Sequence, residues 1–386
     1  MDNMHATNAR VLHRFGLVSR PILALLVAIF MLFSAGILVA MPSAEEQEPA
    51  GEPVPATESE PATERSEPAD GDQDEAAEAQ LPERVRTITL GTLRGPTALA
   101  LAPMIDGNPE ISTRTADELI EAEMAYAIEG SPQVLVSRLI SGEVDIATLP
   151  SNVGATLSSR GVPVRIGPTF LWGLLYLLGP EGELSTWEDL EGRTVYSIGR
   201  NTTPDLLLRY FLSEADLSPQ EDVTIDYSFG HVELAQALIA GRAELAVMPE
   251  PLVTQVLLNN QDLGVLIDLQ AEWEVAQGDE GYPQTVFLVR EELASEDPEL
   301  LDAVFAQIRS TIQATLDQPD ESARLAEELG LGFSRAAALR AIDRLNLRYI
   351  GVEQARDALN RYFQVLFELA PDSVGGSVPG DEAYLP

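Results

Sequence analysis

Two stretches of the chain, about a hundred residues apart, have nearly the same pattern. Residues 138–150 read RLISGEVDIATLP, and residues 237–249 read ALIAGRAELAVMP. Each contains the end of an apolar helix, a glycine that stops it, a short apolar strand and a proline that begins the next element. This spacing is far longer than the roughly 20–50 residues of a solenoid repeat. The duplication therefore predicts two similar α/β lobes, and a two-lobed protein usually holds its ligand in the cleft between them.

The N-terminus predicts export of the main body. An apolar run at residues 21–41 is long enough, at about 1.5 Å per residue, to cross the roughly 30 Å hydrocarbon core of a bilayer. Arginines within residues 1–20 predict that this short N-terminus stays cytoplasmic while the remainder is extracytoplasmic. The run is longer than a signal peptide and has a poor cleavage site at residues 42–44, so a membrane anchor is favoured and cleavage stays open.

Residues 42–84 predict a disordered acidic tether. They consist mainly of Glu, Pro, Ala, Ser and Asp, and such a segment cannot bury enough apolar surface to offset its ordering entropy. The simple interpretation is a spacer between the apolar run and a folded body that begins near Val85.

The charged composition excludes several function classes. The net charge of −38 disfavours nucleic acid and anionic membrane surfaces as partners, because both require a basic footprint. The chain has no Lys, which excludes Schiff-base chemistry, and no Cys, which excludes disulfides, thiolate metal sites and a lipid-modified N-terminal Cys. An acidic surface without Lys also suggests a high-salt habitat, where repulsion between carboxylates is screened.

Catalytic groups are scarce as well. His231 is the single histidine after the apolar run, and nucleophile-elbow, zinc-protease and phosphate-loop motifs are absent from the sequence. We therefore expect a binding protein and not an enzyme, without cofactor or metal.

The order of elements predicts two lobes joined by a hinge. Strands at 86–93, 124–128 and 144–149 alternate with helices at 98–104 and 132–140, which is typical of a mostly parallel sheet with covering helices. The same order recurs across 194–247, a strand returns at 285–290, and helical spacing occupies 298–316, 321–329, 334–345 and 351–369. We assign residues 85–178 and 287–386 to lobe 1 and residues 179–286 to lobe 2. The two crossings, near Leu178 and Pro283, would form the hinge.

Polar residues that follow the strands are the candidate ligand contacts, because strand ends of parallel sheets face the ligand. In the turn Gly199–Pro204, backbone N–H groups and the positive end of the next helix could hold an anion or a carbonyl-rich ligand, although an ordinary cap by Thr202 or Thr203 explains the same residues. Ser151 and Asn152 can donate and accept hydrogen bonds, and Glu250, at the equivalent place in the second copy, can accept from an amine or ring N–H. Each could also simply cap the next helix.

Aromatic and basic residues complete the candidate set. Trp172 and Tyr176 could stack on a flat ligand or belong to the core, and Arg94 and Arg200 are candidate countercharges. The predicted ligand-binding residues are Arg94, Pro96, Thr97, Ser151, Asn152, Trp172, Asn201, Thr202, Thr203 and Glu250.

Several short stretches resemble one family of proteins. They are the turn 95–97, the stretch 142–150, GLLY at 173–176, WEDLEGRTV at 187–195, the turn 199–204, PEP at 249–251 and the ending at 376–384. Together they are similar to solute-binding proteins of ABC importers of the nitrate, sulfonate and taurine type, a group that includes binders of thiamine-pyrimidine precursors. The resemblance extends from Val85 to the end of the chain.

The resemblance implies a type II periplasmic-binding-protein fold whose lobes close on a small solute, with an ABC permease and ATPase as partners. The solute class stays open among oxyanions, sulfonates and heteroaromatic amines. The chain departs from the family by lacking the usual lipid-anchoring Cys, so the apolar run at 21–41 would replace that anchor. A membrane-anchored bilobal sensor that binds a solute without delivering it is the alternative function.

Overall fold

The computed structural model describes residues 81–278 and 281–386. The predicted cytoplasmic N-terminus, the apolar run at 21–41 and residues 42–80 of the tether lie outside the described residues. Within 81–278 and 281–386, none of the helices is both long and apolar enough to cross a bilayer.

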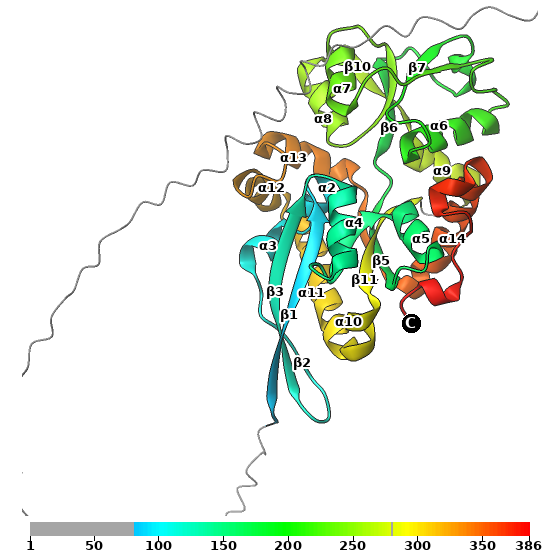
Figure 1. Cartoon of the computed structure of the whole chain (residues 1–386). Coiled ribbons are helices and arrows are strands. Elements are labelled where there is room, and N and C mark those ends of the chain that lie inside the picture. The colour runs from blue at the N-terminus through cyan, green and yellow to red at the C-terminus, as the bar shows by residue number, and fades with distance from the viewer. Residues whose placement is uncertain (1–80, 279–280) are drawn as a thin grey trace, which may run out of the picture. The chain divides into compact units, whose positions relative to one another are not determined.

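Two sheets organise the described part of the chain (Figure 1). Sheet A has the order β12-β5-β11-β4-β1-β3-β2, and sheet B has the order β10-β6-β9-β7-β8. The strands of sheet A are β1 (Glu83–Leu93), β2 (Ile111–Arg114), β3 (Leu119–Glu129), β4 (Ile146–Pro150), β5 (Val164–Trp172), β11 (Pro283–Arg290) and β12 (Leu347–Ile350). Those of sheet B are β6 (Leu175–Pro180), β7 (Thr194–Tyr196), β8 (Thr224–Asp226), β9 (Leu245–Pro249) and β10 (Leu263–Asp268). We call sheet A with its helices lobe 1, and sheet B with its helices lobe 2.

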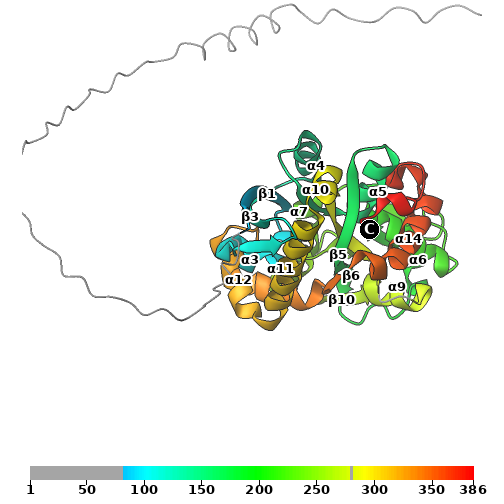
Figure 2. The same cartoon turned by 90° about the horizontal axis from the view of Figure 1, so that it is seen from below.

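Helices cover both sheets. Those of lobe 1 are α2 (Pro96–Ala100), α3 (Ala102–Gly107), α4 (Pro132–Ser141), α5 (Ser151–Ser159), α10 (Glu291–Glu296), α11 (Pro298–Asp317), α12 (Pro319–Glu328), α13 (Arg335–Ala341) and α14 (Val352–Leu369). Those of lobe 2 are α6 (Thr203–Glu214), α7 (His231–Ile239), α8 (Leu252–Asn259) and α9 (Leu269–Gln277). Short 3-10 turns are η1 (Glu188–Leu190), η2 (Ile342–Arg344), η3 (Pro371–Val374) and η4 (Asp381–Ala383). The view from below shows α11 alongside α3 and α12, which pack against it (Figure 2).

The duplicated stretches form the two central strands. β4 lies between parallel β1 and antiparallel β11, and β9 lies between parallel β7 and antiparallel β6. The glycine that ends the preceding helix is left-handed in both copies, with φ of 82° at Gly142 and 67° at Gly241. A side chain is strained in that conformation, so glycine is the natural helix stop at both places.

The chain passes between the sheets twice. It leaves sheet A after β5 and enters sheet B at β6, so the first crossing is at residues 173–174, a few residues before the predicted boundary at Leu178. It returns through α9 and enters sheet A at β11, close to the predicted return at Pro283. Buried rings pack where the return segment meets α14: Trp273 and Tyr282 lie 5.8 Å apart and Tyr282 and Tyr362 also 5.8 Å apart, between ring centres. Part of the apolar core therefore lies at the return crossing.

Several local features differ from the sequence prediction. The helix expected at 98–104 is two short helices, α2 and α3, that meet at Leu101. Strand β2, which pairs with β3, was not predicted, and neither were β10 and β12, which pair with β6 and β5. β1 begins at Glu83, inside the predicted tether, because its first residues pair with β3 from Glu83 opposite Leu119.

Candidate functional site

The carboxyl ends of β1 and β4 carry a chain of buried hydroxyl groups. The Thr148 hydroxyl donates to Thr92 Oγ1 over 2.9 Å, the Thr92 hydroxyl donates to Thr97 Oγ1 over 3.1 Å, and the Thr97 hydroxyl donates to the Leu93 carbonyl over 2.7 Å. The predicted residues Pro96 and Thr97 form the first turn of α2, which begins without a side-chain cap. The Thr97 hydroxyl proton is thus already donated to a backbone carbonyl of lobe 1.

The first turn of α5 follows β4 directly. Ser151 is fully buried and donates to the Pro283 carbonyl, and Asn152 Nδ2 donates to the Ser373 carbonyl over 3.3 Å. The helix begins after Pro150 with no side-chain cap. Its two predicted side chains therefore fix neighbouring backbone, while the first-turn N–H groups of α5 have no side-chain acceptor at the cap position.

In lobe 2, the turn Gly199–Pro204 is held by an acid of its own helix. The buried carboxylate of Asp205 accepts from the Asn201 backbone N–H over 2.6 Å and from the Tyr227 hydroxyl over 2.5 Å. Asn201 adopts a φ of 61°, and Thr202 is the N-cap of α6, but its hydroxyl donates to the Ile198 carbonyl over 2.7 Å instead of capping. The predicted anion position at this turn thus already faces a carboxylate.

Thr203 contacts the other lobe. It is the first residue of α6, it is buried, and it lies close to Tyr362 of α14, where it acts to lower the pKa of Tyr362. The predicted contact residue therefore links lobe 2 to the last long helix of lobe 1.

Glu250 also contacts lobe 1. Its side chain is fully buried after β9, where Oε2 accepts from the Thr254 backbone N–H and Oε1 from the Thr254 hydroxyl, both over 3.0 Å. Arg344, at the end of η2 in lobe 1, pairs with Glu250 Oε1 through Nε and donates from Nη2 to Thr254 Oγ1. Three donors therefore surround the carboxylate that we expected to accept from a solute.

Both predicted aromatic residues are buried beside the first crossing. Trp172 Nε1 donates to the Arg348 carbonyl over 3.0 Å, and the Arg348 guanidinium lies 4.6 Å from the Trp172 ring centre. The Tyr176 hydroxyl donates to the Arg344 carbonyl over 2.8 Å, and burial raises the pKa of Tyr176 well above its ordinary value. These contacts match the core alternative that the sequence left open for both residues.

The predicted countercharges point to other partners. Arg94 is exposed and donates to the Gly330 carbonyl, between α12 and α13. The Arg200 guanidinium stacks 4.4 Å from the ring centre of Tyr227, and His231 is exposed at the start of α7. The cations closest to Trp172 and Glu250 are instead Arg348 and Arg344, which sequence reasoning missed. Arg344 lies in a stretch whose local pattern predicts only helix, and Arg348 lies in the unpredicted strand β12, so their roles depend on chain pairing that the sequence does not display.

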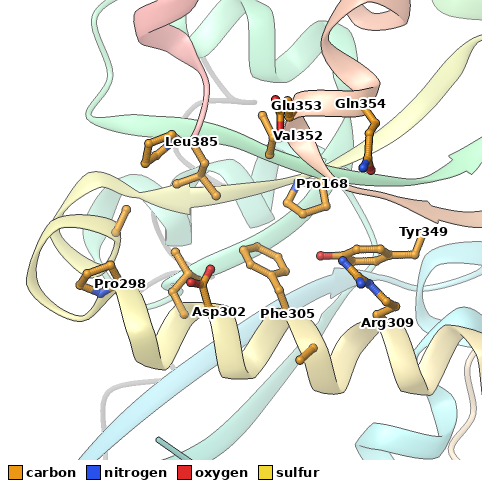
Figure 3. Close-up of a pocket in the computed structure, with 15 residues that line it drawn as sticks. Pro168, Pro298, Asp302, Phe305, Arg309, Tyr349, Val352, Glu353, Gln354 and Leu385 are labelled. Carbon is orange, nitrogen blue, oxygen red and sulfur yellow. The ribbon is translucent and has the colours of Figure 1, made fainter. Parts of the chain in front are cut away.

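A cavity of about 530 Å³ lies within lobe 1 and contains none of the predicted residues (Figure 3). Its wall combines apolar side chains such as Phe305 and Leu385 with charged ones such as Asp302. Figure 3 shows Arg309 over the ring of Tyr349, 4.8 Å from its centre. Burial raises the pKa of Tyr349 to about 12, while Arg309 acts in the opposite direction. Because sheet B contributes no residue to its lining, this cavity does not join the two lobes.

Comparison with solved structures identifies the fold. An ABC transporter structure from Parabacteroides distasonis is 25% identical, covers 77% of this chain and 98% of its own, and has a TM-score of 0.65. The periplasmic aliphatic sulphonate binding protein SsuA from Escherichia coli is 16% identical, covers 76% of this chain and 97% of its own, and has a TM-score of 0.59. The periplasmic nitrate-binding protein NrtA from Synechocystis PCC 6803 is 12% identical, covers 75% of this chain and 84% of its own, and has a TM-score of 0.52. The predicted type II periplasmic-binding-protein fold is confirmed.

The family follows from the sequence itself. No curated protein matches the chain by sequence. A family model described as "ABC transporter, phosphonate, periplasmic substrate-binding protein" matches residues 115–339, which is more than half of the chain. The chain therefore belongs to the family of periplasmic substrate-binding proteins of phosphonate ABC transporters, the non-enzymatic components that bind a solute for an import system.

Proposed function

We propose that the chain binds a small solute carrying a tetrahedral oxyanion, a phosphonate or a sulfonate, between the carboxyl ends of β1 and β4 in lobe 1 and of β7 and β9 in lobe 2. The description of the matching family names phosphonate, and aliphatic sulphonate appears in the name of SsuA. The strand ends in question are those of parallel neighbours, which share one edge of each sheet. Because the family is periplasmic, the chain acts outside the cytoplasm.

The single observation that carries the choice of ligand class is the saturation of Glu250. A heteroaromatic amine needs a carboxylate or carbonyl acceptor, and Glu250 was the predicted one. Its two oxygens already accept from Arg344 and twice from Thr254. Displacing Arg344 would separate a half-buried guanidinium from its fully buried carboxylate partner, which is costly. This supports an oxyanion over an amine.

The donors for an oxyanion would be mostly uncharged. The first turn of α5, at Ser151 and Asn152, begins without a side-chain cap at the end of β4, where N–H groups and the helix dipole favour negative charge. Asn201 and Thr202 are exposed on the lobe 2 side. The strong negative charge of the chain does not oppose this, because at 0.1 M salt charges more than ~10 Å apart are largely screened.

Thermal unfolding of the full chain tests the ligand class. Methylphosphonate and methanesulfonate are compared with an aminopyrimidine, each at rising concentration. A bound oxyanion stabilises the folded state by RT ln(1 + [L]/Kd), which is about 2.7 kcal/mol at one hundred times Kd. The melting temperature should therefore rise as its concentration increases. Stabilisation by the aminopyrimidine alone, with neither oxyanion active, would contradict the proposed class without affecting membership of the family.

We further propose that residues 21–41 anchor the chain to the membrane, since the sequence provides no Cys for a lipid anchor. Alkaline extraction of membranes that contain the full chain should leave it in the pellet. A version that lacks residues 1–41 should not sediment with membranes. Recovery of the full-length chain in the soluble fraction, with a new N-terminus after residue 41, would show cleavage instead.

A further inference from the structure

We infer that Glu250 is a positioning residue that holds the two lobes in register through Arg344, and not a residue that contacts the solute. The argument concerns the network formed by Tyr176, Glu250, Thr254 and Arg344, which we call the Arg344 network. It builds on the solute-binding function of the family.

The network joins parts of the chain that lie in different lobes. Tyr176, Glu250 and Thr254 lie in β6, after β9 and in α8, all in lobe 2. Arg344 ends η2, and two residues separate it from β12, which pairs with β5 in sheet A. The contact between Glu250 and Arg344 is therefore a bond between lobes.

Arg344 uses both its side chain and its backbone in this link. Its guanidinium binds Glu250 and Thr254, while its carbonyl accepts from the Tyr176 hydroxyl over 2.8 Å. The Glu250 backbone N–H in turn donates to the Leu174 carbonyl, at the first crossing, over 3.0 Å. Arg344 is therefore attached through its side chain and its backbone, and Glu250 through its carboxylate and its backbone N–H. These bonds restrict rotation of η2 against the crossing segment.

Burial of the Glu250 carboxylate makes the pairing with Arg344 necessary. The Glu250 side chain has no solvent exposure, whereas that of Arg344 is 30% exposed. A carboxylate without exposure requires its partners, so the arrangement in which Arg344 reaches Glu250 is favoured over arrangements that pull them apart. The pair thereby selects one relative placement of the lobes even when no solute is present.

Solute affinity depends on that placement. If only a fraction of molecules has both lobes correctly placed, the apparent Kd equals the intrinsic Kd divided by that fraction. Loss of the pair should therefore weaken solute binding by the same factor by which the competent fraction falls, without removal of any solute contact.

The test measures the distance between lobes directly. Because the chain has no cysteine, Val134→Cys on α4 and Val232→Cys on α7 provide the only two thiols, both at exposed positions, for spin labels. Pulsed electron paramagnetic resonance on the full chain, without solute, gives the distance distribution. Glu250→Gln and Arg344→Gln are compared with Arg344→Lys, which keeps the charge, and with Arg340→Gln, an exposed arginine four residues earlier as the matched control.

We expect Glu250→Gln and Arg344→Gln each to broaden the distribution at least twofold or to add a second peak. Arg344→Lys should lie between these variants and the parent, and Arg340→Gln should match the parent. Methylphosphonate affinity should fall in the same order. An unchanged distribution in Glu250→Gln overturns the inference, and so does loss of methylphosphonate binding without a change in distance, because a direct solute contact would then explain Glu250.

A second variant covers the case in which Glu250→Gln does not fold. Thr254→Val removes the hydroxyl that Glu250 and Arg344 share while it keeps the side-chain shape. Broadening in a folded Thr254→Val chain supports the inference, and a parental distribution overturns it. Since this readout uses no solute, its outcome is separate from the proposed oxyanion class.

Discussion

Asp297 is the buried acid that holds the first strand, β1, against the helices α10 and α11. It is 2% exposed between α10 and α11, and its carboxylate pairs with Arg84 and Arg86 of β1. Hydrogen bonds from Arg84, and then from Arg86, hold the pKa of Asp297 below its ordinary value. Asp297→Asn removes the charge that both guanidinium groups share. We expect a loss of about 1–3 kcal/mol in the free energy of unfolding, measured by urea denaturation. Asp106→Asn, at an exposed position, is the control and should change it little.

The same carboxylate predicts a pH dependence. Because its folded pKa is lowered, its contribution is present above the unfolded Asp value of about 3.9 and is lost as pH falls through the folded pKa. The difference in unfolding free energy between the parent chain and Asp297→Asn should therefore be constant near neutral pH and shrink below about pH 4. A difference that stays constant down to pH 2 would argue against a lowered pKa.

At the residue scale, the sequence located polar side chains but not their partners. It placed Thr203 and Glu250 correctly at the starts of helices after strands, because turn chemistry is local. Their partners, Tyr362 and Arg344, are more than ninety residues further along the chain. Pairing over such a separation is set by the packing of α14 and η2 against lobe 2, and no local pattern reports it. Whether the remaining predicted residues touch solute stays a prediction.

Among the elements, the first crossing depends on one glycine. Gly173 has a φ of +75°, and a Cβ there would collide with Gln270 Oε1 and lie 3.0 Å from Tyr282 Cε1. Gly161 has a similar φ of +71° but nothing within 4 Å of a Cβ. Gly161→Ala should therefore cost only the backbone strain, about 1–2 kcal/mol, whereas Gly173→Ala adds the collision. Thermal melts of both should show the larger decrease for Gly173→Ala, and equal decreases would mean that the crossing is loosely packed.

The sequence predicted many strands and helices because their periodicity is strong. It did not divide residues 164–178, a continuous apolar stretch that ends at the predicted crossing near Leu178. Strands β5 and β6 are both buried, so hydrophobicity continues through the crossing and gives no boundary. The division is marked only by Gly173, whose left-handed backbone the letters alone do not reveal. β2 was missed for a different reason: it has four residues and pairs only at the edge of sheet A.

For the whole molecule, repulsion among the many acidic side chains should affect stability in a way that can be measured. The first 80 residues carry about −10 of the net charge of −38, which leaves about −28 on the remainder. Screening lengths fall from ~30 Å at 0.01 M salt to ~3 Å at 1 M, and screening stabilises the compact state more than the expanded one. The melting temperature of the full chain should therefore rise with sodium chloride over this range. A matched sucrose series separates screening from solute exclusion, and a flat salt response would remove the case for a high-salt habitat.

The insertion of β11 between β4 and β5 has a consequence for how the protein is made. When the ribosome has synthesised β4 and β5, these two strands cannot yet take their places in sheet A, because β11, residues 283–290, lies between them in the sheet. At ~5–20 residues per second, the missing strand follows on the order of ten seconds later. During that interval the emerging polypeptide has no completed sheet A to resist unfolding. Sheet A therefore cannot be completed until β11, and then β12, have been synthesised.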